Sequence, residues 1–316
     1  MSLRAYVLMI IILLSCIACQ TTLGALNTAI PSPSLSPQPA RTLRPTQTPR
    51  AIAAVTTVVS PTALPSLTPS ALPTVFFQPT AAPAPASLVI GQSAEGRDIL
   101  AHRFGTGEHT LLLVGGIHTG YEANTVILVH ELIEHFERAP GDVLPGMTLI
   151  LIPVANPDGL TRGREAAGRF NANGVDLNRN WSCEWSPEAY WREYRVDPGA
   201  RAFSEPETQA LAQFIRQTQP AAVVFYHSAA RGVFAGGCQG DHGSLALAAV
   251  IGEAANYPYG QAFSAYPVSG TGATWVDGQG IPAVDLELTT TEDSEFVRNL
   301  NGVMAVQCWL VGSVSC

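Results

Sequence analysis

Histidine and glutamate stand four residues apart in the stretch GGIHTGYEAN, which spans positions 115–124. His118 and Glu122 are both ligand types that zinc accepts, and His227 closes the later apolar stretch VVFYH. A catalytic zinc uses three nitrogen or oxygen ligands and keeps a further position open for water. Residues four apart on a helix lie on nearly the same side, so the spacing is compatible with chelation. Taken alone, such a pair is more often part of a polar surface.

A second histidine pair, His130 and His135 in the stretch HELIEH, is poorly placed for a metal. The zinc-protease motif H-E-x-x-H spaces its histidines four apart on a helix, whereas these two are five apart. At roughly 100° per residue they point about 140° away from each other. We therefore expect them to lie on an exposed helix face.

The stretch RFNANGVDLNRNW, at 169–181, collects two arginines and four asparagines around a short apolar segment. This polar density indicates recognition of an anion. The guanidinium of Arg179 can bind a carboxylate through two parallel hydrogen bonds, and Asn178 can assist it. The alternative is a polar loop whose asparagines serve turns.

Residues 283–288, AVDLEL, alternate in polarity as a half-buried strand does. Asp285 and Glu287 are expected on one face and the three aliphatic residues on the other. A carboxylate at a buried strand end is costly unless it is paired or used in chemistry. This pattern indicates either a catalytic carboxylate or a structural ion pair.

The elements that must position these groups form an α/β pattern. TLLLVGG, MTLILIP, AAVVFYHS and AVDLELT have the short apolar runs of buried strands. Helices are expected at EANTVILVHELIEHFER, SEPETQALAQFIRQTQ, GSLALAAVIGEAANY and VRNLNGVMAVQCWL, and two extended segments flank a turn in SLVIGQSAEGRDILAHRFG. We expect a mixed, mostly parallel central sheet with helices on both faces.

Two local details follow from this pattern. The second of these helices has a clear start signal, with Ser204 as its cap and Pro206 in its first turn. The first helix should bury one side, formed by Val126, Val129, Ile133 and Phe136.

Polar residues follow several of the predicted strands: His118, Asn156, Asp158 and His227. Ligands of open α/β sheets bind beyond the carboxyl ends of the strands. We therefore expect the site at this edge of the sheet.

The chain has three compositional zones. Residues 1–19 have one basic residue near their start, Arg4, followed by an apolar run. This pattern predicts an export segment. The run ends in LLSC and CIAC, which resemble a lipoprotein cleavage site with Cys16 or Cys19 as the lipidated residue; an anchor or an ordinary secretory signal is the alternative. Residues 20–86, rich in Pro, Ser and Thr, predict a disordered tether, and residues 87–316 one domain.

The formal net charge of −8 gives no basic footprint for nucleic acid. Membrane attachment is expected only through the N-terminal lipid or anchor. Export makes disulfides plausible, and the four cysteines of the domain allow three connectivities. We favour Cys183–Cys238 together with Cys308–Cys316.

Together these motifs resemble the zinc metallocarboxypeptidases of the carboxypeptidase A type. GQSAEGR resembles the opening G-x-S-x-x-G-R of that family, GGIHTGYE its first ligand pair, and FSEPET, YHS and DLEL its later segments. NPDG and GVDLNRNW are its most specific signatures, and both are intact. One departure concerns the first ligand pair, which the family spaces three apart as H-x-x-E.

The resemblance implies a role for each matching residue. His118, Glu122 and His227 would hold one zinc ion per chain, and Glu287 would be the general base. Arg169 would stabilise the oxyanion. The terminal carboxylate of the substrate would be bound by Asn178 and Arg179, and Tyr266 would close over it.

Three hypotheses of function follow. The first is a carboxypeptidase that trims peptides, and the second is a cell-wall peptide hydrolase or amidase with the same chemistry. The third is a binding module that captures peptide carboxylates through Arg179 without cleaving them. The segment TGATW after Tyr266 has no acid at the expected pocket floor, which argues against a preference for Lys or Arg ends unless Asp277 reaches the pocket.

Overall fold

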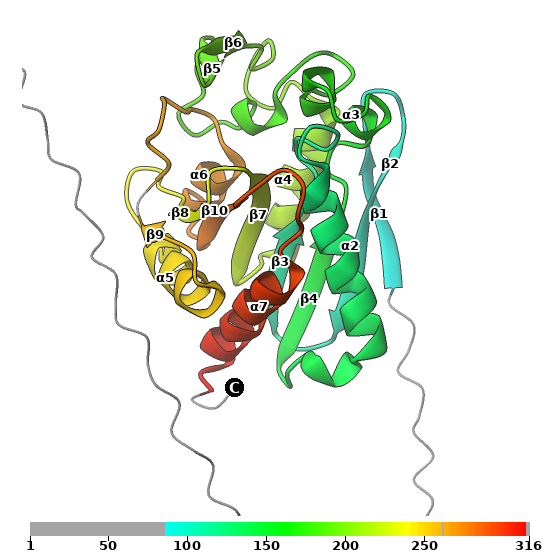
Figure 1. Ribbon diagram of the computed structural model, residues 1–316, viewed down its shortest axis with the longest axis vertical. Coiled ribbons are helices and arrows are strands. Elements are labelled where there is room, and N and C mark those ends of the chain that lie inside the picture. The colour runs from blue at the N-terminus through cyan, green and yellow to red at the C-terminus, as the bar shows by residue number, and fades with distance from the viewer. Residues whose placement is uncertain (1–85, 261, 314–316) are drawn as a thin grey trace, which may run out of the picture. The chain divides into compact units, whose positions relative to one another are not determined.

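A sheet of eight strands forms the centre of this computed structural model, which describes residues 86–260 and 262–313 (Figure 1). The predicted export segment and all but the last residue of the predicted tether lie outside these residues. In spatial order the strands are β1 (Ala86–Gln92), β2 (Asp98–Gly105), β4 (Met147–Ile152), β3 (His109–Val114), β7 (Ala222–Ser228), β10 (Ala283–Leu288), β8 (Gly232–Ala235) and β9 (Tyr259–Gly260).

The pairing of the strands is mixed. The central pairs β4–β3, β3–β7 and β7–β10 are parallel, as is the short β8–β9 pair. The remaining pairs, β1–β2, β2–β4 and β10–β8, are antiparallel. This confirms the mixed, mostly parallel sheet expected from the sequence.

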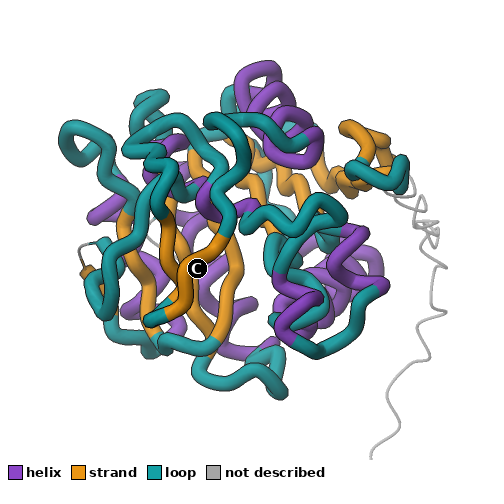
Figure 2. The backbone as a smooth tube through the Cα atoms, turned by 90° about the horizontal axis from the view of Figure 1, so that it is seen from above, coloured by secondary structure: helices purple, strands orange, loops and turns teal. Residues whose placement is uncertain are grey.

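Helices cover both faces of the sheet (Figures 1 and 2). One face packs against α2 (Ala123–Arg138), α5 (Ser244–Ala255) and α7 (Phe296–Val311), and the other against α4 (Pro206–Thr218) and α6 (Gly272–Asp277). Because side chains alternate along a strand, Leu111 and Leu113 of β3 join the first core and Leu112 and Val114 the second. All four side chains are at most 1% exposed, so the continuous apolar run of β3 belongs to a strand that is covered on both faces.

The remaining described elements are short and lie between β4 and α4, apart from one turn after α2. They are η1 (Pro140–Asp142), α3 (Pro157–Thr161), η2 (Ala166–Arg169), η3 (Leu177–Arg179), and the paired strands β5 (Ala189–Trp191) and β6 (Tyr194–Val196). None of the helices in residues 86–260 and 262–313 is long and apolar enough to cross a membrane.

Helix α2 buries the side that its periodicity predicts, since Val126, Val129, Ile133 and Phe136 are all buried. His130 is exposed. The Nε2 atom of His135 lies 2.7 Å from Oδ2 of Asp142 instead of facing His130. The two histidines therefore do not share a site, as expected.

The predicted cap of α4 is wrong by one residue. Glu205 occupies the capping position without a side-chain cap bond, and the helix begins at Pro206. The hydroxyl of Ser204 donates to Oε1 of Glu205 at 2.6 Å and accepts from Nδ2 of Asn180 at 2.9 Å. These side-chain bonds compete with the helix terminus for the hydroxyl.

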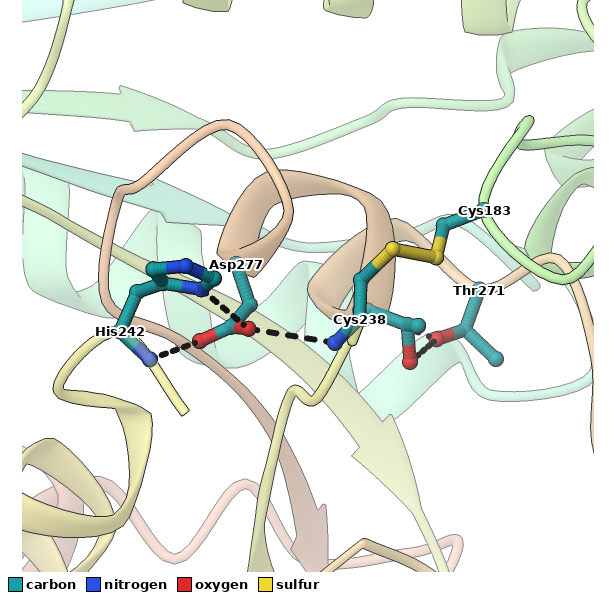
Figure 3. Close-up of a disulfide and its surroundings, with 6 residues drawn as sticks. Cys183, Cys238, His242, Thr271 and Asp277 are labelled. Carbon is teal, nitrogen blue, oxygen red and sulfur yellow. Dashed lines mark hydrogen bonds and ion pairs between the residues drawn. A yellow bond between two sulfur atoms is a disulfide. The ribbon is translucent and has the colours of Figure 1, made fainter. Parts of the chain in front are cut away.

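A disulfide joins Cys183 to Cys238, which confirms the first predicted pair (Figure 3). It ties the segment after Trp181 to the segment after β8, across 55 residues of sequence. The second predicted pair includes Cys316, which lies outside the described residues.

Candidate active site

The pair of His118 and Glu122 is held in one turn of backbone that leads into α2. The amide N–H of Glu122 donates to the carbonyl of His118 at 2.9 Å, which closes the spacing of four into a helical turn. The Nδ1 atom of His118 lies 2.9 Å from Oε1 of Glu122. The two side chains are therefore on the same side, as the spacing allows.

Gly120 lets this turn pack closely against the segment that follows β4. A Cβ atom at Gly120 would lie 2.2 Å from the carbonyl oxygen of Gly163 and 2.6 Å from that of Gly159. Its amide N–H donates to the carbonyl of Gly168 at 3.1 Å. A side chain at this position would push the ligand turn away from its support.

His227 completes the cluster from near the end of β7. Its Nδ1 atom lies 3.2 Å from Oε2 of Glu122, and the two imidazole rings are 5.0 Å apart. One ligand atom from each of the three residues lies within 4.8 Å of the others. All three side chains are at most 3% exposed, so the structure brings together the predicted ligand set in a buried position.

The three residues fit a catalytic zinc. Two imidazole nitrogens and a carboxylate oxygen are a donor set that this metal uses when a position stays open for water. Burial alone would lower the pKa of His227, but the carboxylates of Asp285 and Glu122 outweigh it and raise this pKa to about 10. A negative field that stabilises an imidazolium also stabilises a bound dication. The electrostatics of the cluster thus agree with its geometry.

Asp176 supports the cluster, and the sequence analysis had assigned it no role. Its Oδ1 lies 2.9 Å from Nε2 of His118 and also accepts from the amide of Asn178 at 3.0 Å. Burial opposes its ionisation, but Arg169 and His118 keep its pKa well below the usual range. A carboxylate on the outer ring nitrogen orients a histidine ligand and fixes its tautomer. Its place within GVDLNRNW was the available signal.

Arg169 faces the same cluster from the end of η2. Its Nη1 donates to Oε1 of Glu122 at 3.1 Å, and its Nε donates to Oδ2 of Asp176 at 3.0 Å. The guanidinium carbon lies 4.7 Å from the centre of the Trp191 ring. Arg169 is buried, so its charge acts at short range on whatever occupies the pocket.

Asn178 and Arg179 belong to η3 on the other side of the pocket. The side-chain carbonyl of Asn178 accepts from the amide of Gly272 at 2.8 Å, and its Nδ2 lies 3.2 Å from Nε2 of His227. The Nε and Nη2 atoms of Arg179 donate to the carbonyl of Tyr190 at 3.1 and 3.0 Å. These contacts fix both side chains along the pocket wall.

Glu287 enters the pocket from β10, where it lies opposite His227 of β7 in the parallel register. Its Oε2 accepts from the amide of Ala230 at 3.1 Å. Burial raises the pKa of Glu287 to about 7, and the charge of Glu122 acts in the same direction. A carboxyl group with a pKa near neutrality can both accept and return a proton.

One pocket contains all eight residues that the sequence analysis selected. Its lining includes His118, Glu122, Arg169, Asn178, Arg179, His227, Tyr266 and Glu287. The ring of Tyr266 lies 4.8 Å from that of Phe263, which also lines the pocket. Trp191 and Arg192 line it as well, without having been expected there. Asp285 also lines it, in agreement with the alternation of AVDLEL, which places Asp285 on the same face as Glu287.

Asn156 and Asp158 follow a strand as expected but do not line this pocket. Asn156 caps α3 by accepting from the amide of Gly159 at 2.9 Å. Asp158 accepts from the hydroxyl of Ser93 at 2.6 Å and from Nη1 of Arg97 at 2.6 Å. NPDG and GQSAEGR therefore bind each other. Asn156 of NPDG also donates to the carbonyl of Ile117, next to the ligand turn, at 3.3 Å.

Asp277 also lies outside the pocket lining, although the sequence left open its entry there. Its carboxylate is fully buried and accepts from the hydroxyl of Ser244 at 2.6 Å. It also contacts His242 and accepts from the amide of Cys238 at 3.2 Å (Figure 3). This carboxylate holds the segment of the disulfide in place.

The chain is similar to known proteins over most of the described domain. A family model described as zinc carboxypeptidase matches residues 80–301. Murein peptide amidase A of Escherichia coli strain K12 is 44% identical over 82 residues, covering 23% of this chain and 32% of the relative. Zinc carboxypeptidase A 1 of Anopheles gambiae is 28% identical over 205 residues, covering 55% of this chain and 47% of the relative. The chain thus spans less than half the length of these two curated relatives.

The fold is also similar to that of solved structures. Bovine thrombin-activatable fibrinolysis inhibitor, solved in complex with tick carboxypeptidase inhibitor, superimposes with a TM-score of 0.63 at 20% identity. The match covers 73% of this chain and 91% of the other. At this identity the likeness concerns the fold alone.

Proposed function

This chain belongs to the zinc carboxypeptidase family, and from that premise we propose that it hydrolyses the C-terminal peptide bond of peptides. The observation that carries the proposal is the convergence of His118, Glu122 and His227 beside a carboxyl group of raised pKa, that of Glu287, in one pocket.

The roles of the side chains follow from their positions. Zinc held by His118, Glu122 and His227 would supply Lewis acidity and would lower the pKa of a water molecule toward neutrality. Glu287 accepts a proton from the attacking water and passes it to the leaving amine. Arg169 stabilises the negative charge that develops on the scissile carbonyl oxygen.

The second arginine of the pocket recognises the C-terminal end of the substrate. Arg179 binds the terminal carboxylate of the substrate, with Asn178 beside it, because a guanidinium matches the two oxygens of a carboxylate. Tyr266 closes over the bound residue and excludes water. Binding of the terminus at a fixed distance from Glu287 makes the action that of an exopeptidase.

The test of this proposal is the substitution Glu287→Gln, assayed on blocked dipeptides. Loss of the proton acceptor should lower kcat by about 10²-fold to 10⁴-fold, while zinc content stays the same. Asp98→Asn, an exposed change on β2, is the control and should leave kcat unchanged. Peptide binding without turnover by the unsubstituted, zinc-loaded chain would contradict the proposal and favour a carboxylate-binding module.

A cell-wall peptide is the second candidate substrate. It is favoured by the 44% identity with a protein named murein peptide amidase A, over 82 residues. The chemistry of the pocket is the same for both substrates. Parallel digestion of ordinary peptides and purified cell-wall peptides separates the two, because only the preferred class should give high kcat/KM.

We also propose that the enzyme works outside the cytoplasm, attached to a membrane. The apolar run before Cys16 and Cys19 supports export and lipidation, and the Pro-rich residues 20–86 support a tether. Mass spectrometry of the mature N-terminus tests this, since a diacylated cysteine at either position is expected. A mature chain that keeps Met1 and lacks lipid would contradict it.

A further inference from the structure

Asp285 lies on the pocket side of β10, two residues before Glu287. Residues two apart on a strand point to the same face, so both carboxylates border the same space. The Asp285 side chain is 17% exposed. The proposed reaction uses Glu287 but leaves Asp285 without a role.

The carboxylate of Asp285 has an ion-pair contact with His227, but one of its oxygen atoms remains without a hydrogen bond. Within the part of the chain that the structure describes, its buried Oδ1 atom accepts no hydrogen bond. The Nε2 atom of His227 lies 3.3 Å away but outside hydrogen-bond geometry. A histidine that holds zinc is a neutral imidazole, so His227 would then offer Asp285 no full positive charge. A buried carboxylate of this kind is costly unless a partner arrives from outside the chain. Its position indicates that the partner enters with the substrate.

The walls near Asp285 suit an aliphatic stem. Phe234 and Phe263 line the pocket with their ring centres 5.2 Å apart, and Val268 lines it as well. A long side chain with a cationic end buries its methylene groups against such walls and presents its charge to a carboxylate. Cations are also stabilised near aromatic rings.

Other charges of the pocket do not take this role. Arg169 pairs with Asp176, and Arg179 donates to the carbonyl of Tyr190. In the proposed reaction both arginines also face negative groups of the substrate, whereas the ion-pair contact of Asp285 within the described residues is with His227. Arg192 is exposed and stacks over the Trp191 ring at 5.7 Å. An exposed guanidinium is screened by solvent and repels a cation only weakly.

We propose that Asp285 is a specificity-determining residue that selects substrates whose C-terminal residue carries a cationic side chain. The proposal rests on the proposed function, and it replaces the sequence-based argument against Lys or Arg ends. That argument considered the segment after Tyr266, whereas the acid enters the pocket from β10. Two sources offer this chemistry, namely peptides that end in Lys or Arg and cell-wall peptides that end in a diamino acid.

The experiment measures kcat/KM of the full zinc-loaded chain on blocked dipeptides that differ only in the last residue. That residue is Lys, Arg, norleucine or Glu. Norleucine keeps the aliphatic stem of lysine and removes the ammonium. We expect kcat/KM for Lys to exceed that for norleucine by about 10-fold to 100-fold, the range expected for a desolvated charge pair. Asp285→Asn should bring this ratio close to one, mainly through KM. Both proteins are assayed at saturating zinc, because Asp285 also faces His227.

Two further variants make the result specific. Asp285→Thr removes the charge with a residue that suits a strand, in case the amide variant folds poorly. Asp98→Asn makes the same chemical change on an exposed strand position and should keep the ratio of the unsubstituted enzyme. A matched pair of cell-wall tripeptides, one ending in a diamino acid and the other in norleucine, separates the two sources.

Three outcomes would overturn the inference. They are no preference for Lys in the unsubstituted enzyme, an unchanged kcat/KM ratio of Lys to norleucine in both Asp285 variants, or an equal loss of kcat/KM on all substrates in those variants. The last would mean that Asp285 positions His227 instead. If no peptide is cleaved, the proposed function fails, and calorimetric binding of free lysine and norleucine then decides the inference alone. The inference is supported if the unsubstituted chain binds lysine more tightly than norleucine and Asp285→Asn loses this difference. It is rejected if the unsubstituted chain binds both equally.

Discussion

His118 and Glu122 show how one additional residue is accommodated between two proposed zinc ligands. The backbone hydrogen bond from Glu122 to His118 makes the spacing a helical turn, so both side chains point to one place. Gly120 allows the turn to pack against the backbone of Gly159 and Gly163. The departure from H-x-x-E therefore leaves the geometry of a ligand pair intact.

The orientation of His118 depends on Asp176, and this gives a prediction at the residue scale. Asp176→Asn should weaken zinc binding by about 10-fold to 100-fold, because the carboxylate that orients the ring and fixes its tautomer is lost. Competition with a chromogenic chelator measures the affinity. Asp98→Asn should bind zinc like the unsubstituted chain, and an unchanged affinity in Asp176→Asn would contradict the role.

At the scale of elements, α6 and the segment after β8 are joined by one buried carboxylate. Asp277 of α6 accepts from the hydroxyl of Ser244. It also accepts from the amides of His242 and Cys238, and the disulfide holds the same segment to Cys183 (Figure 3). Closing a loop of this length by a disulfide stabilises by about 4 kcal/mol in the chain-entropy view. Thr271, the N-cap residue of α6, lines the pocket, so both contacts hold elements that border it.

Stability should therefore depend on Asp277 in a pH-dependent way. Burial raises its pKa, but hydrogen bonds from Ser244 and His242 outweigh this and place the pKa below its model-peptide value of 3.8. A lowered folded-state pKa contributes stability above the unfolded pKa and loses it as the pH falls through the folded value. Asp277→Asn should reduce the free energy of unfolding by about 1–3 kcal/mol at pH 7.

Urea unfolding at several pH values measures this difference. The difference in free energy of unfolding between the unsubstituted chain and Asp277→Asn should stay constant above about pH 5. It should narrow as the pH falls below 3.8, because the Asp277 carboxyl of the unsubstituted chain then becomes protonated. Asp98→Asn gives the baseline for an exposed aspartate on a strand. A difference that is the same at all pH values would show that the charge of Asp277 is not what stabilises the segment.

At the scale of the whole molecule, the sheet gathers groups that lie far apart in the sequence. His118 follows β3, His227 lies near the end of β7 and Glu287 near the end of β10, and these three strands are neighbours with parallel pairing. Parallel strands end at one edge, so their terminal residues meet there. The proposed zinc cluster thus links the segment after β3 to β7, and Glu287 of β10 lies beside it.

Removal of metal should consequently destabilise the whole domain. A ligand that binds only the folded state raises the free energy of unfolding by about 2.7 kcal/mol at 100 times its Kd. We expect the Tm to fall when a chelator removes zinc and to recover when zinc is restored. Glu122→Gln should show a much smaller zinc-dependent change in Tm, and equal changes in both proteins would place the stabilising metal elsewhere.

The sequence by itself determined the elements and the chemistry of this protein. The apolar runs of β3, β4 and β7 and the periodicity of α2 depend on local composition, and the ligand, base and arginine residues lie in short motifs that can be recognised without coordinates. The first disulfide pair was also predicted, although three connectivities were open.

Only the tertiary structure decided which polar residues share a pocket. Asp158, Asp176, Asp277 and Asp285 look alike in a sequence, yet the first and third hold loops, the second supports His118, and the fourth borders the substrate space. Burial and partners depend on contacts between segments that are tens of residues apart. No local pattern encodes such contacts, because they arise only when the sheet brings its strand ends together.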